Sequence, residues 1–385
     1  MNRISYALRK ELHKRQTHFS YKTLWQRLHL DPMLLVSIAI LVSFGLIILY
    51  SASNQNHAMI LRQGMRLALA FLLLVIFAQI PPCKYRLWAP WLFGIGVLLL
   101  LSVLIVGRIG KGAQRWLDLG LFHFQPSEMM KLATPMVVAW YFSIRPLPPS
   151  FKSISFAISF IMIPVLLIAK QPDLGTALLV LLSGGWIFIF AGINIRLIGS
   201  LLVVFGISAP LLWTHLHDYQ QQRVLTFLNP ERDPLGNGYH IIQSKIAIGS
   251  GGLLGKGWLM GSQSHLHFLP ENATDFIFAV CGEEFGWVGS LLLLCAMMFV
   301  LFRMLFIVSQ AQDSFSRLLS GGIALSFFSA LFVNIGMVTG ILPVVGVPLP
   351  LVSYGGTSVV SLFIGFGILM SIHTHRTFFS ELPIK

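Results

Sequence analysis

Residues 275–302, DFIFAVCGEEFGWVGSLLLLCAMMFVLF, decide the fold. The segment is long and apolar enough to cross a hydrocarbon core of about 30 Å as a helix. It nevertheless begins with an acid, Asp275, and carries two more, Glu283 and Glu284, although carboxylates are costly beside lipid. Because backbone polar groups cannot stay unpaired in lipid, we predict a transmembrane helix whose acids face protein or the membrane surface.

The rest of the chain has the same character. Of its 385 residues, 55% are hydrophobic and only 11% are charged, whereas about a quarter of the residues of a soluble protein are charged. The short alternating segments that are typical of a membrane β-barrel do not occur. We therefore predict an all-α integral membrane protein with about ten transmembrane helices. The predicted spans are 33–50, 58–79, 88–106, 127–144, 153–169, 173–191, 197–213, 275–302, 317–341 and 353–372.

The charged residues orient these spans. Residues 1–30 carry seven lysines and arginines, and a basic arm before a first span is typical of the cytoplasmic side. This arm accounts for much of the net charge of +13, so we do not infer a nucleic-acid partner. We predict a polytopic membrane domain over 31–376 and a short cytoplasmic tail over 377–385, with both termini cytoplasmic.

Two predicted outside connections are unlike the rest. The connection 107–126 is basic and aromatic, and the connection 214–274 is a long loop between the seventh and eighth spans. Loops of that length tend to carry function. The section 229–258 of this loop is basic and rich in glycine, but its spacing fits neither a P-loop nor a dinucleotide-binding motif. We expect a helix around 238–249 that lies on the membrane surface.

Three spans that run from outside to inside begin with an acid: Glu128, Asp173 and Asp275. One interpretation is structural, because an acid in the first turn is stabilised by the positive end of the helix dipole. The other is functional, with the outer helix ends converging on a cavity at the membrane surface. Glu128 and Lys131 lie on one helical face, so we predict a structural ion pair between them.

Basic side chains on the same outer face would suit a diphosphate, because cations and backbone N–H groups can share its charge. An ordinary solvated loop is the alternative. We predict no metal site, because the three cysteines lack CxxC spacing and His265 and His267 lack a third ligand. The candidates for diphosphate binding are Lys111, Arg115, Arg223, Arg232, Lys245 and Lys256.

Five segments resemble the SEDS family of bacterial cell-wall polymerases, and within it the elongation members more than the division members. They follow one another in the family's order and cover nearly the whole membrane part. The segments are QPSEMMKLA (125–133), KQPDLGTALL (170–179), NPERDPLGNGYHIIQSKIAIGSGGLLGKGW (229–258), LPENATDFIFAV (269–280) and ILPVVGVPLPLVSYGGTS (341–358).

The resemblance implies a peptidoglycan glycosyltransferase that polymerises lipid II for cell elongation and rod shape. It implies that Asp275 is catalytic, that Glu128 and Lys131 are the family's membrane ion pair, and that Lys111 and Arg115 match its basic stretch. Asp275 would be the general base in an inverting displacement of undecaprenyl diphosphate. The active site is expected on the periplasmic side of the bacterial inner membrane.

The resemblance also implies partners: a class B penicillin-binding protein as transpeptidase, and the rest of the elongation machinery. A divalent cation, Mg²⁺ or Mn²⁺, could bridge the diphosphate, although the sequence does not show ligands for it. A flippase for a lipid-linked precursor and a non-catalytic scaffold for a penicillin-binding protein remain as alternatives. A flippase would have paired broken helices and charges near the middle of the bilayer, whereas here the charges gather at outer helix ends.

Overall fold

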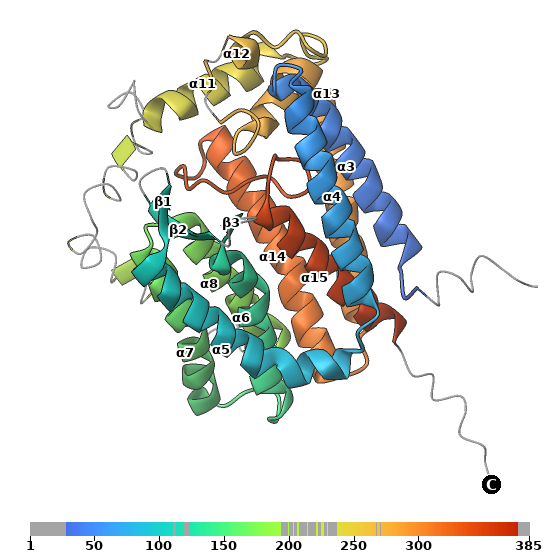
Figure 1. The fold of residues 1–385 in the computed structure, drawn as a ribbon, viewed down its shortest axis with the longest axis vertical. Helices are drawn as coiled ribbons and strands as arrows, with labels where there is room; N and C mark the ends of the chain where they lie inside the picture. The colour runs from blue at the N-terminus through green and yellow to red at the C-terminus, as the bar shows by residue number, and fades with distance from the viewer. Residues whose placement is uncertain are drawn as a thin grey trace, which may run out of the picture.

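The computed structural model describes residues 28–110, 113–118, 123–193, 237–266, 268–269 and 271–375, with isolated positions between 199 and 229. These parts form a helical bundle (Figure 1). Its helices are α3 (Pro32–Ala52), α4 (His57–Ala78), α5 (Pro82–Val106), α6 (Pro126–Ser143), α7 (Phe151–Lys170), α8 (Leu174–Phe190), α11 (Asn237–Ser250), α12 (Ser262–His265), α13 (Ile277–Ser309), α14 (Ser314–Thr339) and α15 (Thr357–Thr374).

The prediction of an α-helical membrane protein is confirmed. Seven helices, α3, α4, α5, α7, α13, α14 and α15, are long and apolar enough to cross a membrane. The shorter helices α6 and α8 coincide with two further predicted spans. The remaining predicted span, 197–213, falls largely outside the described residues, as do the basic arm up to residue 27 and the tail.

Short polar side chains fix where several of these helices begin. Asp31 accepts a hydrogen bond of 2.8 Å from the N–H of Leu34 and so caps α3. Asp173 caps α8 in the same way. Such caps satisfy backbone donors that have no partner within the helix. For Asp173 the structural interpretation of an acid at a helix start is therefore correct.

The two ends of the bundle differ. The helices α11 and α12 lie across one end, and α11 coincides with the helix expected around 238–249 (Figure 1). The start of α3 and the end of α15 lie at the opposite end (Figure 1). With the predicted orientation, α11 and α12 belong to the outer end.

The connection between α5 and α6 contains a small antiparallel sheet that the sequence did not predict. Its strands are β1 (Arg108–Gly110), β2 (Ala113–Asp118) and β3 (His123–Phe124), in the order β1-β2-β3. The strands are at most six residues long, too short to stand out as a pattern. The sheet lies at the start of α6 and brings aromatic side chains beside the bundle.

The helix α13 is broken at Gly286, whose φ of 66° and ψ of −160° are not helical. The glycine-rich loop 251–261 supplies hydrogen-bond partners to the backbone on both sides of the break. The N–H groups of Lys256 and Gly257 donate to the carbonyls of Glu283 and Glu284, at 3.0 and 3.1 Å. On the other side of the break, the N–H groups of Trp287 and Val288 donate to carbonyls of the same loop. The backbone groups that the break leaves without helical partners are thus satisfied.

Candidate active site

Asp275 lies at the outer end of the bundle, just outside α13. The N-cap of that helix is Phe276, so Asp275 does not occupy the capping position that Asp173 has in α8. The Asp275 side chain is half-buried and faces the loop between α14 and α15. A Cβ added at Gly346 of this loop would lie 3.5 Å from Oδ2 of Asp275. The carboxylate therefore lies against the loop between α14 and α15, close to the backbone of Gly346.

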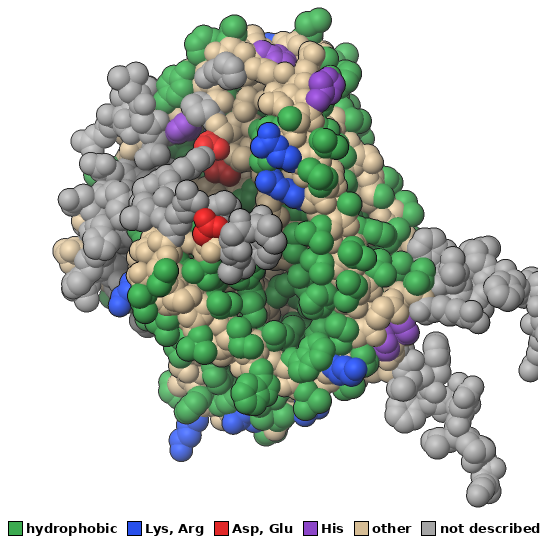
Figure 2. All heavy atoms as spheres, in the orientation of Figure 1, with side chains coloured by type: hydrophobic (Ala, Val, Ile, Leu, Met, Phe, Trp, Pro, Cys, Tyr) green, Lys and Arg blue, Asp and Glu red, His purple; other side chains and the backbone are tan. Residues whose placement is uncertain are grey.

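A large cavity lies beside this region, between α4, α5, α6 and α15. Its volume is about 1250 Å³, above the usual range for a site that encloses a small molecule. Figure 2 shows this face of the molecule hollowed, with hydrophobic side chains in the hollow and charged side chains near it. Most of the lining is apolar. The polar side chains in the lining include Arg66, Glu128, Tyr354, Thr357 and Ser361.

The cavity reaches the neighbourhood of Asp275 through Tyr354. The N–H of Tyr354 donates a hydrogen bond of 2.9 Å to the carbonyl of Ala273, two residues before Asp275. Its ring lies under the guanidinium of Arg66, with Cζ 4.6 Å from the ring centroid. One wall of the cavity is therefore directly bonded to the segment that carries the carboxylate.

Sequence reasoning missed Arg66 as a site residue. Arg62 and Arg66 are basic residues near the outer end of the predicted span 58–79, where a long basic side chain can reach back to the interface. In the structure Arg62 donates to the carbonyl of Ala58 within its own helix, whereas Arg66 lines the cavity. The signal for Arg66 in the sequence is a positive charge within an apolar span, because a charge there is costly unless it faces protein or a cavity.

Glu128 and Lys131 form an ion pair, with Nζ of Lys131 2.6 Å from Oε2 of Glu128. Both belong to α6, one turn apart, as their spacing requires. The hydroxyl of Ser361, on α15, donates a hydrogen bond of 2.9 Å to the same carboxylate oxygen. The pair thus joins α6 to α15 at the wall of the cavity.

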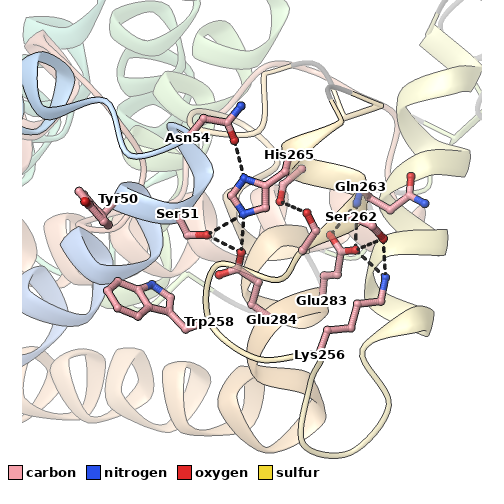
Figure 3. Close-up of polar contacts among 12 residues, drawn as sticks. Tyr50, Ser51, Asn54, Lys256, Trp258, Ser262, Gln263, His265, Glu283 and Glu284 are labelled. Carbon is pink, nitrogen blue, oxygen red and sulfur yellow. Dashed lines mark hydrogen bonds and ion pairs between the residues drawn. The ribbon is translucent and has the colours of Figure 1, made fainter.

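The acids Glu283 and Glu284 point in different directions (Figure 3). Glu283 is fully buried and accepts hydrogen bonds from the hydroxyl of Ser262, at 3.1 Å, and the N–H of Gln263, at 3.0 Å. Glu284 accepts one from the hydroxyl of Ser51 on α3. Neither carboxylate meets lipid, because one faces a polar loop and the other a neighbouring helix.

His265 completes this polar cluster (Figure 3). Its Nε2 lies 3.5 Å from Oε1 of Glu284, and its Nδ1 lies 2.5 Å from Oδ1 of Asn54. The contacts tie α12 to the connection between α3 and α4. Both ring nitrogens of His265 thus have partners within the protein.

The predicted diphosphate ligands do not gather in one described place. Arg115 donates to the carbonyl of Pro172 and lies 3.8 Å from Asp173. Lys256 pairs with Glu283 at 2.7 Å, and Lys245 is exposed on α11. Their role in diphosphate binding stays a prediction. Lys111, Arg223 and Arg232 lie outside the described residues.

Within the described part of the chain, no group of three or more His, Cys, Asp or Glu side chains could hold a metal ion. Asp275 is the carboxylate next to the loop between α14 and α15, and a bridging Mg²⁺ or Mn²⁺ would need most of its ligands from the diphosphate or from water. The prediction of such an ion remains untested.

Together, the apolar bundle, the carboxylate at its outer end and the large apolar cavity define a polytopic membrane protein with a site suited to an amphipathic ligand. The chain belongs to the SEDS family: residues 31–378 match the family of FtsW, RodA and SpoVE that is described as "Cell cycle protein".

The chain is similar to curated relatives over nearly its full length. It is 53% identical to the peptidoglycan glycosyltransferase MrdB of Escherichia coli strain K12, over 94% of this chain and 98% of the relative. It is 37% identical to MrdB of Helicobacter pylori strain J99, over 94% and 93%. It is 31% identical to the peptidoglycan glycosyltransferase RodA of Treponema pallidum, over 90% and 98%.

Solved structures have the same fold. A chain of a peptidoglycan synthase complex that coordinates polymerization and crosslinking is 34% identical, with a TM-score of 0.79 over 89% of this chain and 97% of that one. The rod shape determining protein RodA of Thermus thermophilus is 28% identical, with a TM-score of 0.68 over 89% and 96%.

Proposed function

We propose that this chain is a peptidoglycan glycosyltransferase that polymerises lipid II into glycan strands, with Asp275 as the general base. The observation that carries the proposal is the position of a half-buried carboxylate at the outer end of the bundle, bonded through its own segment to the wall of a large apolar cavity. A lipid-linked sugar needs both, a place for its tail and a polar site at the membrane surface. The relatives named as peptidoglycan glycosyltransferases support the same activity.

The proposed reaction needs a general base for the acceptor and cations for the leaving group. The acceptor's sugar 4-hydroxyl is a poor nucleophile until Asp275 takes its proton. The oxygen then bonds to the donor's anomeric carbon while the bond from that carbon to the diphosphate breaks. The diphosphate leaves with the electron pair and needs no proton, provided that cations hold its charge. An α-linked donor gives a β-linked product, so a single inverting displacement suffices.

The cavity between α4, α5, α6 and α15 is where we place an undecaprenyl chain. Its lining is mainly leucine, methionine and aromatic side chains, which suit a hydrocarbon. Arg66 and Tyr354, in the same lining, would lie near the diphosphate of a lipid so placed. Lys111, Arg115, Arg223, Arg232, Lys245 and Lys256 remain further candidates for that charge.

We infer that the site faces the periplasm, that the protein lies in the bacterial inner membrane with cytoplasmic termini, and that a class B penicillin-binding protein is its partner. The partner proposal is supported by the similarity to a chain of a peptidoglycan synthase complex. Crosslinking of new strands by a neighbouring transpeptidase would follow polymerisation directly.

The test is polymerisation of lipid II by the purified full-length chain with its transpeptidase. Asp275→Asn should lose activity by on the order of 100-fold or more, because the amide cannot accept the proton. Asp313→Asn is the matched control: Asp313 caps α14 at the other end of the bundle, and asparagine caps equally well.

The alternatives give different results in the same preparation. A scaffold would leave polymerisation unchanged in Asp275→Asn, which would refute the assignment of the base. A flippase would move labelled lipid II across vesicles without polymerising it.

A further inference from the structure

We propose that Asn334 is a positioning residue for Asp275, a role that rests on the proposed function of that carboxylate. Asn334 lies on α14, near its outer end, and its side chain is fully buried. Its Nδ2 donates a hydrogen bond of 2.8 Å to the backbone carbonyl of Asp275, which is 59 residues away in the sequence. One amide therefore fixes the main chain at the point from which the carboxylate projects.

The same amide holds a second segment. Nδ2 of Asn334 also donates to the carbonyl of Val347, at 2.7 Å. Val347 follows Gly346, the residue that faces the Asp275 carboxylate. Gly346 has a φ of +73°, a backbone conformation that residues other than glycine rarely adopt. Asn334 thus sets the distance between the carboxylate and the loop that covers it.

These two bonds orient the amide. Both hydrogens of its NH₂ group are used, and its Oδ1 is buried without a hydrogen-bond partner among the described residues. Rotation of the amide by 180° would place Oδ1 against two carbonyl oxygens, which repel it. The buried Oδ1 without a partner costs free energy, whereas the two bonds from Nδ2 satisfy the carbonyls of two backbone segments. A role in holding two backbone segments together explains the asparagine.

Neighbouring bonds extend the same arrangement. The hydroxyl of Ser353 donates to the carbonyl of Thr274 at 2.5 Å, and the N–H of Tyr354 donates to that of Ala273 at 2.9 Å. Three successive carbonyls, ending at Asp275, are therefore held by α14 and by the loop that follows it. The bond from Asn334 is the one at the catalytic position itself, and it comes from a rigid helix, whereas the other two come from a loop.

Loss of this bond should affect the chemical step more than binding. Misplacement of a reacting group by about 1 Å can lower a rate on the order of 100-fold. For Asn334→Ala we expect kcat for lipid II polymerisation to fall about 10-fold to 100-fold, with KM changed less than about 3-fold. Asn334→Asp should be at least as impaired, because a carboxylate cannot donate to either carbonyl.

Ser329→Ala is the matched control. Ser329 is a buried polar residue on the same helix, and it accepts a hydrogen bond of 2.7 Å from Nε1 of Trp186, away from the site. Loss of that bond should lower the melting temperature without changing kcat of the folded protein. If Asn334→Ala behaves like Ser329→Ala, with kcat retained, the residue is structural and the proposal fails.

The double variant Asn334→Ala/Asp275→Asn separates the two proposals. If Asn334 acts through Asp275, the double variant is no slower than Asp275→Asn alone. A further drop in the double variant would mean that Asn334 acts by another route, which overturns this proposal. Full activity in Asp275→Asn would instead refute the proposed base, whatever Asn334→Ala does.

Discussion

The ion pair of Glu128 and Lys131, 2.6 Å long, lies between two cavities. Glu128 lines the large apolar cavity, and Lys131 lines a smaller one of about 90 Å³ beneath the loop that follows Gly346. Ser361 donates to Glu128 and lines both. The pair is therefore part of the wall between the two cavities.

Breaking this pair should be more harmful than removing it. Glu128→Gln leaves the ammonium of Lys131, only 20% exposed, without its carboxylate. We expect a loss of about 3 kcal/mol in the free energy of unfolding. The double variant Glu128→Gln/Lys131→Met removes both charges and should be the more stable of the two. Thermal unfolding in detergent measures this, and equal or greater destabilisation of the double variant would contradict a coupled pair.

The second prediction concerns the pair of Lys256 and Glu283. Lys256→Met leaves a fully buried carboxylate that, among the described residues, keeps the hydroxyl of Ser262 and the N–H of Gln263 as donors. The melting temperature should fall, and the double variant Lys256→Met/Glu283→Gln should recover most of it. Kinetics of the recovered double variant then test the diphosphate role. If Lys256 also binds the donor, KM for lipid II stays raised although the fold is restored, whereas a normal KM assigns Lys256 to the ion pair alone.

The third prediction separates two reasons for glycine in the loop 251–261. Gly255 has a φ of +82°, and a Cβ there would clash with the carbonyl of Glu284. Gly252 has a φ of +57°, and a Cβ there would meet nothing within 4 Å. Gly252→Ala should cost only backbone strain, about 1 kcal/mol. Gly255→Ala should cost clearly more, because it also pushes the loop off the broken helix. Melting temperatures and protease sensitivity of the loop compare the two, and equal effects would refute the close packing.

Hydropathy predicted the spans because a segment of about 20 apolar residues has few alternatives to a membrane helix. It could not predict the break at Gly286, since hydropathy carries no information on the local backbone conformation and the hydrogen bonds across the break come from the separate loop 251–261. The bond from Asn334 to Asp275 is similarly invisible in the sequence. An asparagine in an apolar span indicates a buried partner, but not which one.

Some of the candidate site residues could be predicted from the sequence, whereas the partners of others could not. Asp275, Glu128 and Lys131 stood out as charges at the ends of apolar segments and in motifs that resemble a family. The partners of Arg115 and Lys256 did not, because a basic residue in a polar loop can face solvent, substrate or an acid with equal local sequence. Only packing selects among these, and packing depends on residues far apart in the chain.

At the end of the bundle opposite the site, a charged cluster joins three helices. Asp31 is buried at the start of α3, 2.5 Å from Nη2 of Arg303 and 2.8 Å from Nδ1 of His373. Burial alone would raise the pKa of Asp31, but the hydrogen bonds from His373 and Arg303 outweigh it and hold that pKa well below its usual range. Asp31 therefore stays ionised at every pH that the cell offers, and its contribution to stability is lost only in strong acid.

A second group whose protonation affects stability, the imidazole of His29, lies next to this cluster. It stacks on the ring of His375, with centroids 3.8 Å apart, and burial followed by the charge of His375 lowers the pKa of His29. A lowered pKa means that the folded state binds the proton less well than the unfolded state, so stability is full above the ordinary histidine pKa of about 6.5 and falls below it. The melting temperature should drop between pH 7.5 and 5.5, and His29→Phe, which keeps a ring for the stack, should reduce that drop. His57→Gln, at the outer end, is the control and should keep the wild-type drop. An unchanged pH dependence in His29→Phe would show that protonation of His29 does not oppose folding.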